Sequence, residues 1–303
     1  MAQFYASVSF YNENGTIKTN KNENYDSSIK YTRYNFITNV NLKVTESTTI
    51  DIGAQGFLGD GNYPAQRSET IFSSTMEVNP VKYPAMFIVD GKEYVPGTHS
   101  QGGERNPYAD ATKRGYAKEM NNKIQSNIRL TQDLSFLTQG LKFSTMFAYD
   151  VTTYRRTEYN KRENTYYFAN REKPYDEKGN PILTSTWDKG SSTLSWGGTG
   201  FTGQRKDYFE ASLTYDRAFG SHRIGAMSVY TQQNRTVNNA GSIIEAIPYR
   251  MQGVAGRLTY SWKDRYFGEF NVGYNGGENF PKERRFGTFP AFGIGWVASN
   301  ESF

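Results

Sequence analysis

The chain has 303 residues, of which 16% are aromatic and only 36% are hydrophobic, and its mean hydropathy is −0.73. No run approaches the roughly 18 consecutive apolar residues of a membrane helix, which excludes a helical membrane protein but not a β-barrel, whose strands are apolar only at alternate positions. Its 35 Lys and Arg are interspersed with 30 Asp and Glu, which excludes a one-sided basic stripe for nucleic acid, and the lack of cysteine excludes a disulfide framework.

Alternation of apolar residues with small or polar ones predicts about ten β-strands, because successive side chains of a strand point to opposite faces. The alternation begins at once, with Phe4, Ala6, Val8 and Phe10 separated by Tyr and Ser. In the run 221–235 neither face is clearly apolar, so the sequence leaves its orientation open. The predicted strands lie near residues 3–12, 31–44, 48–58, 122–132, 140–153, 205–217, 221–235, 249–262, 265–275 and 287–298.

The connections between these strands alternate in length. The short ones lie at 45–47, 133–139, 218–220 and 263–264, and the long ones at 13–30, 59–121, 154–204, 236–248 and 276–286. Strict alternation is typical of outer-membrane barrels, which have short periplasmic turns and long extracellular loops, whereas a soluble sandwich has modest turns at both ends. We therefore predict an all-β fold, an antiparallel transmembrane β-barrel segment.

The hairpin around Lys263-Asp264-Arg265 indicates which side chains share a face of the predicted sheet. On the apolar face, in contact with lipid, we expect Leu258, Tyr260, Phe270 and Val272. On the polar face, lining a wet lumen, we expect Arg257, Glu269 and Asn271. The alternative is a soluble sheet that packs the same apolar face into a protein core.

Aromatic residues near the same hairpin predict an interfacial belt. If 263–264 is a periplasmic turn, Tyr260, Trp262 and Tyr266 lie at that membrane boundary. The last strand then runs downward and brings Trp296 to the level of Trp262. Amphipathic rings gather at such boundaries because one side prefers lipid and the other water.

The loop expected at 154–204 carries the candidates for substrate contact, Tyr166, Tyr167, Trp187 and Trp196. Sugar rings have apolar C–H faces that pack on aromatic faces, and this pattern therefore indicates a glycan. The alternative is that these rings pack the loop's own small core or meet a partner protein. In the loop 59–121, AQRSETIFSSTMEV (65–78) predicts a short helix with Ile71 and Met76 on its packed side.

A glycine pattern at 197–203, GGTGFTG, matches GxGxxG at Gly198, Gly200 and Gly203. A dinucleotide site needs that turn between a strand and a helix. Here RKDYFEASLTYD follows and alternates as a strand, so we expect a flexible external loop and no bound cofactor.

The remaining polar residues give no sign of catalysis or metal binding. His99 and His222 lie in a loop and at a turn, without a second ligand at metal spacing. Glu158 and Glu163 are separated by basic residues and are typical of a solvated loop rather than of a glycosidase pair. We expect no catalytic residue, no metal and no enzyme activity.

Several long stretches resemble the SusC/RagA family of TonB-dependent outer-membrane transporters. They are GRLTYSWKDRYFGEFNVGYNG, RRFGTFPAFGIGWVASNESF, YTRYNFITNVNLKVTESTTIDIG and NPYADA at 106–111. The resemblance implies a 22-stranded barrel around an N-terminal plug. It also implies a SusD-type surface lipoprotein that binds the nutrient, usually a glycan oligomer, and energy supplied through the TonB complex.

The resemblance implies that residues 1–303 are part of one barrel domain, because signal peptide, plug and the remaining strands have no counterpart here. The start, MAQFYASVSFYNENG, has no basic n-region and no apolar h-region, and it resembles the middle of a strand. We therefore expect a curved, open sheet in which 3–12 and 287–298 do not pair.

These observations predict part of a nutrient importer of the cell outer membrane. The expected partners are outer-membrane lipid, a SusD-type lipoprotein, the TonB complex and an oligosaccharide or peptide substrate, with no nucleic acid. A passive porin or adhesin-type barrel remains open as an alternative, as does a soluble β-sandwich carbohydrate-binding module.

Overall fold

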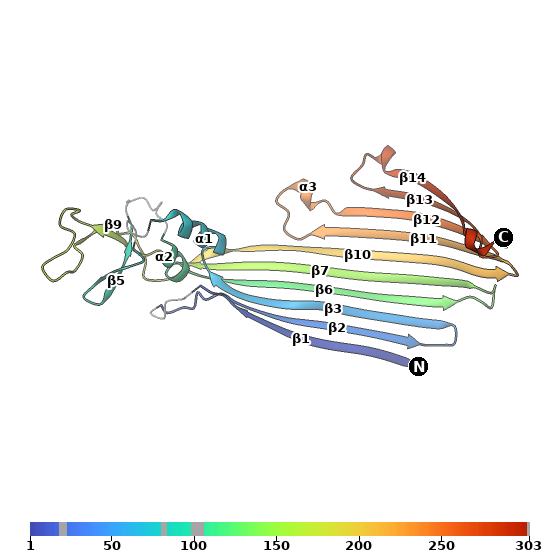
Figure 1. Ribbon diagram of the computed structural model, residues 1–303, viewed down its shortest axis with the longest axis horizontal. Helices are drawn as coiled ribbons and strands as arrows, with labels where there is room; N and C mark the ends of the chain where they lie inside the picture. The colour runs from blue at the N-terminus through green and yellow to red at the C-terminus, as the bar shows by residue number, and fades with distance from the viewer. Residues whose placement is uncertain (18–22, 80–83, 98–105, 302–303) are drawn as a thin grey trace.

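The computed structural model describes residues 1–17, 23–79, 84–97 and 106–301, and its main element is one curved sheet of ten antiparallel strands (Figure 1). Each strand pairs with the next, and over the described ranges the ladder ends at the first and last strands without joining them. The expected open sheet is therefore confirmed. In sheet order the strands are β1 (Ala2–Asn14), β2 (Lys30–Lys43), β3 (Thr48–Pro64), β6 (Gly115–Asp133), β7 (Leu141–Asn160), β10 (Ser195–Phe219), β11 (His222–Val237), β12 (Tyr249–Trp262), β13 (Tyr266–Gly277) and β14 (Phe286–Trp296).

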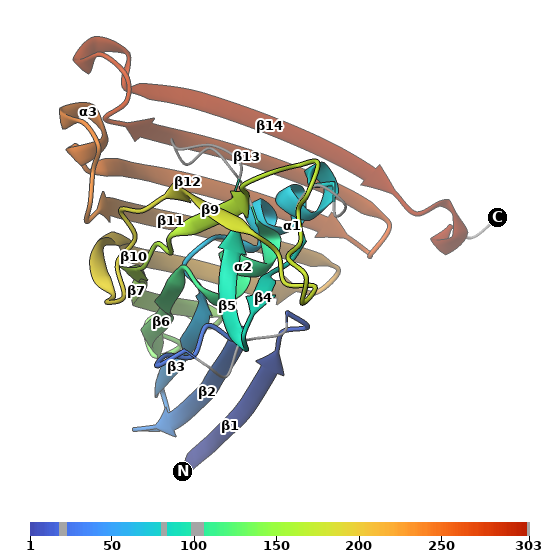
Figure 2. The same cartoon turned by 90° about the vertical axis from the view of Figure 1, so that its left-hand side faces the viewer.

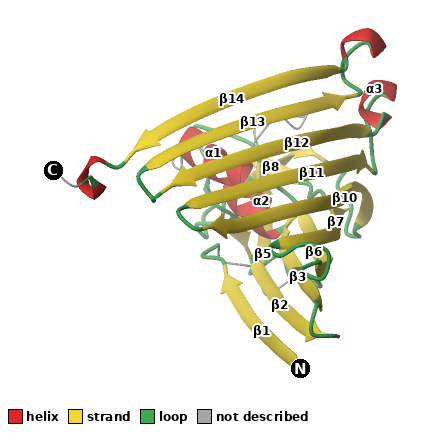
Figure 3. Cartoon of the chain, turned by 90° about the vertical axis from the view of Figure 1, so that its right-hand side faces the viewer, coloured by secondary structure: helices red, strands yellow, loops and turns green. Residues whose placement is uncertain are grey.

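Short and long connections lie at opposite ends of the sheet, as the sequence predicts. We call these the short-turn end and the long-loop end; both chain termini lie at the short-turn end (Figures 1 and 3). In the tight turn between β12 and β13, Lys263 and Asp264 have φ values of 55° and 51°. Two consecutive left-handed residues match the right-handed twist of the flanking strands, which explains the sharp reversal.

The central strands are longer than the sequence predicts. β3, β6, β7 and β10 project past their neighbours at the long-loop end, and β10 alone has 25 residues (Figure 1). The expectation of a flexible loop at 197–203 is therefore wrong, because these residues belong to β10. A register shift between Trp196 and Gly198 marks a β-bulge there, and Gly198 tolerates its φ of 115° because it has no Cβ.

The long loops fold into a compact unit at the long-loop end of the sheet, in front of the strands in Figure 2; we call it the loop unit. It contains α1 (Ser68–Glu77), α2 (Pro107–Thr112) and a second sheet of β4 (Phe87–Val89), β5 (Lys92–Pro96), β8 (Thr165–Phe168) and β9 (Leu183–Trp187). Elsewhere the chain forms α3 (Ile243–Ala246), η1 (Lys282–Arg284) and η2 (Ala298–Asn300). None of the helices in the described ranges is long and apolar enough to span a membrane.

The helix expected at 65–78 is present as α1, but of the two residues predicted to pack, only Ile71 does so. Ile71 is buried, whereas Met76 is 75% exposed. The position that packs in its place is Ser74, whose hydroxyl donates to the Ile71 carbonyl at 2.8 Å. A small polar residue can be buried here because its hydrogen bond is made within the helix.

The strand register gives the large sheet one apolar and one polar face, because residues directly opposite each other point to the same side. The register joins a row of apolar residues across five strands, Val40, Ile52, Ile128, Phe147 and Phe209. It also settles the orientation of β11, which the sequence left open. Ala226 and Tyr230 lie opposite Leu258 and Val254, so they share the apolar face.

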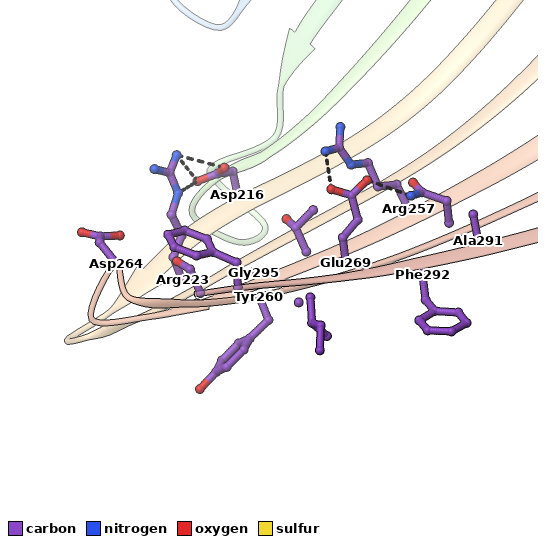
Figure 4. A pocket seen from close by; sticks show the side chains of 16 residues that line it. Asp216, Arg223, Arg257, Tyr260, Asp264, Glu269, Ala291, Phe292 and Gly295 are labelled. Carbon is purple, nitrogen blue, oxygen red and sulfur yellow. Dashed lines mark hydrogen bonds and ion pairs between the residues drawn. The ribbon is translucent and has the colours of Figure 1, made fainter. Parts of the chain in front are cut away.

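The expected facing of the β12–β13 hairpin agrees with this register. Leu258 lies opposite Phe270, and Arg257 lies opposite Asn271. Figure 4 shows Arg257 and Glu269 on the inner, concave side of the strands, and Tyr260 and Phe292 on the outer side. The outer face is bare: Phe292 is 87% exposed and Ile294 is 92% exposed.

The buried apolar residues of the described chain lie in and around the loop unit rather than behind the sheet. They are Ala65, Ile71, Phe87, Val95, Ala109, Ala111 and Ala117. A β-sandwich would cover the apolar face with a second packed sheet. In the described residues the large sheet is a single layer, so its outer face has no protein core to enter.

Phe270 tests this arrangement, because it lies midway along the outer face of β13 with Asn271 beside it on the inner face. Phe270→Arg should lower the free energy of unfolding of the membrane-inserted protein by about 2–4 kcal/mol, since it places a charge near the bilayer midplane. Asn271→Arg, the matched control, should have little effect because the inner face is polar. Denaturant titration in lipid vesicles measures both, and equal losses would mean that the facing is wrong.

Candidate functional site

The concave face forms a polar wall whose charges are paired between strands. Arg257 Nη2 lies 2.8 Å from Glu269 Oε2, and Asn271 Nδ2 donates to Glu269 Oε1 at 2.7 Å (Figure 4). Arg129 on β6 reaches Glu210 on β10 across β7, at 3.3 Å. Such a wall can face water without an uncompensated charge, as the lining of a lumen requires.

The predicted belt residues form a row at the short-turn end. Trp262 lies opposite Tyr266, which lies opposite Trp296, so the three share one level. The rings of Trp262 and Tyr266 stack at 5.5 Å between centroids. Tyr260 is one outward position higher on β12, and all four residues are exposed on the outer face.

The sequence did not predict that His222 belongs to this aromatic row. It lies opposite Trp262, stacks on its ring at 6.3 Å, and its Nδ1 is 2.6 Å from the Tyr260 hydroxyl oxygen. A histidine at a strand end beside aromatic neighbours is the signal that could have indicated it. His99, the other histidine, lies outside the described residues.

Glu301 contacts the aromatic row at its β13 and β14 end. Its carboxylate accepts hydrogen bonds from Tyr266 Oη at 2.6 Å and from Trp296 Nε1 at 3.2 Å, and pairs with Arg265 at 2.9 Å. The hydrogen bond from Tyr266, with those from Trp296 and Arg265, holds the pKa of Glu301 below its ordinary value. The indole and phenol groups thus keep their polar edges away from the outer apolar face.

The apolar band above the row has a defined upper limit. On β13 it runs from Tyr266 to Tyr274, which stacks on Phe286 at 5.1 Å. Above that level the outer face becomes polar, with Arg250 and Glu278 3.7 Å apart. The band therefore matches the ~9–11 residues with which a tilted strand crosses a bilayer.

The structure places three of the four proposed substrate-contact residues in the small sheet and the fourth elsewhere. Tyr166 and Tyr167 lie on β8 and Trp187 on the neighbouring β9, whereas Trp196 lies on β10 and is 71% exposed. The first three have partners within the loop unit. Tyr94 packs edge-on against Tyr166 at 4.9 Å, and the Arg162 guanidinium lies 4.0 Å from the Trp187 ring centroid.

The NPYADA stretch builds α2, around which the loop unit is organised. Asn106 Oδ1 accepts from the backbone N–H groups of Tyr108 and Ala109 at 3.0 and 3.1 Å, which caps the helix, and its Nδ2 donates to the Ala85 carbonyl at 3.1 Å. Pro107 follows the cap, where a proline costs no hydrogen bond. One asparagine thus fixes α2 and ties it to the segment before β4.

A nearly buried cluster of charges, which we call the loop junction, joins three loops that are distant in sequence. Glu23 pairs with Lys113 at 3.3 Å and with Lys161 at 2.8 Å. Lys113 also pairs with Glu93 at 2.8 Å, and Lys161 with Glu163 at 2.7 Å. The junction therefore links the loop after β1 with the loops that follow β3 and β7.

The carboxylates of the loop junction determine the pKa values of its lysines. Burial lowers the pKa of the Lys113 ammonium, but hydrogen bonds and charges from Glu93 and Glu23 outweigh it, so the pKa lies above the ordinary 10.5. Burial opposes the same rise at Lys161, where Glu163 and Glu23 prevail. Burial also raises the pKa of the neighbouring Tyr25 to about 12.

The structure gives no functional role to the glycine pattern at 197–203 or to Glu158 and Glu163. Gly198, Gly200 and Gly203 are inside β10 and precede no helix, so they form no dinucleotide turn. Glu158 pairs with Arg156 at 2.8 Å, and Glu163 belongs to the loop junction. In the described ranges no three His, Cys, Asp or Glu side chains are grouped as a metal site would require.

Known proteins resemble the chain in part of its sequence and in its fold. No protein-family model matches it. The TonB-dependent receptor SusC of Bacteroides thetaiotaomicron is 32% identical over 74 residues, which are 24% of this chain and 7% of SusC. The TonB-dependent receptor P3 of Formosa agariphila is 26% identical over 120 residues, which are 31% of this chain and 12% of P3.

Solved structures of RagAB extend the likeness over nearly the whole chain. The RagAB peptide importer in its open-open state superposes with a TM-score of 0.56, and in its closed-closed state with 0.53. Each match covers 97% of this chain but 32% of the solved chain, at 13% identity. The chain thus has the fold of about one third of that protein. All these relatives bear the names of receptors or importers rather than of enzymes.

Glu23 tests the loop junction, because both lysines share it. Glu23→Gln should destabilise the folded loop unit by about 1.5–3 kcal/mol, the range for hydrogen bonds to charged groups. Hydrogen exchange of 84–97 and 106–114 should accelerate, while exchange in β12 and β13 stays unchanged. Glu172→Gln, at an exposed position of the loop that follows β7, is the control. Equal exchange rates in the two variants would mean that the loop junction does not stabilise the loop unit.

The pH dependence of the loop unit follows from the raised lysine pKa values. A group whose pKa rises on folding contributes stability below its unfolded pKa and loses that contribution as pH rises through the folded value. The loop unit should therefore keep its exchange protection up to about pH 10.5, the ordinary lysine value, and lose it only at higher pH. Loss between pH 7 and 9 would contradict this account.

Proposed function

We propose that this chain, a barrel segment of the SusC/RagA type, forms consecutive strands of a wider barrel that imports nutrients across a bacterial outer membrane with energy from TonB. The observation that carries the proposal is the single-layer sheet with a bare apolar outer face and a charge-paired inner wall. A bilayer and a wet lumen are the surroundings that suit these two faces.

The unpaired edges support a barrel wider than ten strands. β1 and β14 each leave backbone N–H and C=O groups without a strand partner in the described sheet. Each such group costs several kcal/mol in hydrocarbon, so a spanning sheet must be closed by further strands. The match to about one third of the RagAB chain agrees with this requirement.

The aromatic row supports an orientation. In outer-membrane barrels the short turns face the periplasm and the long loops face the exterior. The row of Tyr260, Trp262, Tyr266 and Trp296 would then be the periplasmic belt, and the loop unit would lie on the cell surface. In this orientation the apolar outer face of the sheet would contact the lipid of the outer membrane.

The substrate and the remaining partners are inferred from the similar proteins. We propose a glycan oligomer as cargo, a SusD-type surface lipoprotein as the protein that delivers it, and the TonB complex as the source of energy. The resemblance to the SusC/RagA family, which implies a glycan oligomer as the usual nutrient, and the exposed side chain of Trp196 support a glycan. A peptide cargo, as in the RagAB importer, is the alternative outcome of the experiments.

Energy dependence separates this proposal from a passive porin or an adhesin. Cells that carry the complete gene should take up labelled oligosaccharide, and deletion of TonB should abolish that uptake. Passive diffusion through a pore would continue without TonB. Uptake that survives the deletion would therefore favour the porin, and loss of peptide uptake alone would change the cargo from glycan to peptide.

Trp196 and Trp187 test whether the loop aromatics contact the cargo. Trp196→Ala should reduce uptake several-fold without lowering the amount of folded barrel, because its ring is 71% exposed. Trp187→Ala should act less directly, since Arg162 already covers that ring. Uptake assays with immunoblots of the outer membrane measure both effects; unchanged uptake in the two variants would leave these residues as loop packing.

A further inference from the structure

A hollow of about 340 Å³ lies on the concave face near the long-loop end, away from the candidate substrate residues discussed above. We call it the tyrosine hollow. Its lining comes from β1, β2, β3, β6 and β7 and from Ile29, which directly precedes β2. The strand residues are Glu13, Tyr31, Tyr63, Glu119, Asn121 and Tyr154. Five neighbouring strands thus contribute to one depression in the inner wall.

The register shows that the tyrosine hollow is built from two adjacent rows of inward side chains. One row crosses the sheet as Glu13, Tyr31, Gly61, Glu119 and Arg156. The row below it crosses as Tyr11, Arg33, Gly59, Asn121 and Tyr154. In both rows β3 contributes a glycine, so the floor of the hollow has no side chain of its own.

Tyrosine rings lie over the two glycines. A Cβ added to Gly59 would come within 2.7 Å of Tyr31 Oη, and one added to Gly61 within 2.4 Å of Tyr63 Cε2. Each ring therefore occupies the space that a side chain on β3 would need, and lies along the wall instead of projecting from it. Both tyrosines line the hollow and are partly exposed.

Polar groups surround these rings. The carboxylates of Glu13 and Glu119 and the amide of Asn121 line the hollow. Arg156, largely buried, fixes the back of the site: it pairs with Glu119 and Glu158 and donates to the Ala65 carbonyl at 3.0 Å. Arg156 thus holds Glu119 in place before a ligand arrives, and Glu13 accepts a hydrogen bond from Tyr11 Oη at 2.8 Å. Acceptors that are already held lower the entropic cost of binding.

The hollow continues into two neighbouring depressions with which it shares lining residues. Tyr63 and Glu119 also line a depression that reaches Arg67, at the start of α1. Tyr154 also lines one of about 510 Å³ that extends to residues 197–202 of β10. The three depressions therefore adjoin one another on the inner wall, which suits a chain of linked units.

We propose that the tyrosine hollow is a binding subsite for one unit of a neutral oligosaccharide; this rests on the proposed import of a glycan. The apolar C–H face of the sugar ring packs against the aromatic rings of Tyr31 and Tyr63, which line the hollow. Its hydroxyl groups donate to Glu13 and Glu119 and accept from the amide of Asn121. The carboxylates disfavour an acidic ligand by like-charge repulsion.

The test uses the complete transporter in detergent and isothermal titration with five probes. Four are neutral hexaoses (maltohexaose, cellohexaose, mannohexaose and xylohexaose), and the fifth is a neutral pentapeptide. Wild-type protein should bind one of the hexaoses. Tyr63→Ala should weaken that binding at least about tenfold by removing half of the platform. Gly61→Ala should do the same while keeping the phenol, because its Cβ displaces the Tyr63 ring.

Matched controls separate loss of the subsite from loss of the fold. Gly293→Ala places a Cβ in open space on the same concave face, and Tyr5→Ala removes an inward tyrosine of β1 below the hollow. Both should bind as wild type does. Binding by Tyr63→Ala and Gly61→Ala at wild-type strength would overturn the subsite and leave the proposed import of a glycan intact.

The remaining outcomes test the proposed function itself. If wild-type protein binds the pentapeptide and none of the hexaoses, the cargo is a peptide and the saccharide subsite is wrong with it. If it binds neither class although TonB-dependent uptake of oligosaccharide is observed in cells, the hollow does not retain sugar and the subsite alone is overturned.

Discussion

The constraint on which the structure depends is that a sheet one layer thick has no protein on its apolar side. Every strand between β1 and β14 satisfies its backbone through two neighbours, so the sheet can leave water without losing hydrogen bonds. Large apolar side chains of the outer face, such as Phe292 and Ile294, are consequently exposed. What little core the described chain has lies around α2, and it serves to order the loops at one end of the wall.

The central part of each strand could be predicted from the sequence, because period-two alternation records the difference between the two faces directly. Leu258 and Phe270 alternate with Arg257 and Glu269 as the facing requires, and Trp296 falls at the level of Trp262 as expected. The short-turn end was predictable too, since tight turns between two alternating runs leave little freedom in register. The alternation of short and long connections in the sequence then distinguished the short-turn end of the sheet from the long-loop end.

The rest depends on contacts between distant segments, which alternation does not contain. Residues 197–203 are rich in glycine and resemble a loop, but pairing with β7 makes them a strand. β11 has few apolar residues, and only its neighbours settle its facing. Glu23, Lys113 and Lys161 meet although they are far apart in sequence, and so do the residues of the tyrosine hollow. A Gly-x-Gly-x-Tyr spacing at Gly59, Gly61 and Tyr63 is the one local signal of that hollow.

The central claim is that the face carrying Phe270 and Leu258 lies in lipid while the face carrying Glu269 and Arg257 lies in water. The chain has no cysteine, so single cysteines can be placed at successive positions from 268 to 274 and spin-labelled without interference. Collision of each label with oxygen and with a water-soluble nickel chelate should be measured in the bilayer-inserted protein. Accessibility should alternate strictly, with even positions more accessible to oxygen and odd positions more accessible to the chelate. Uniform accessibility along β13, or alternation with the opposite phase, would contradict the central claim.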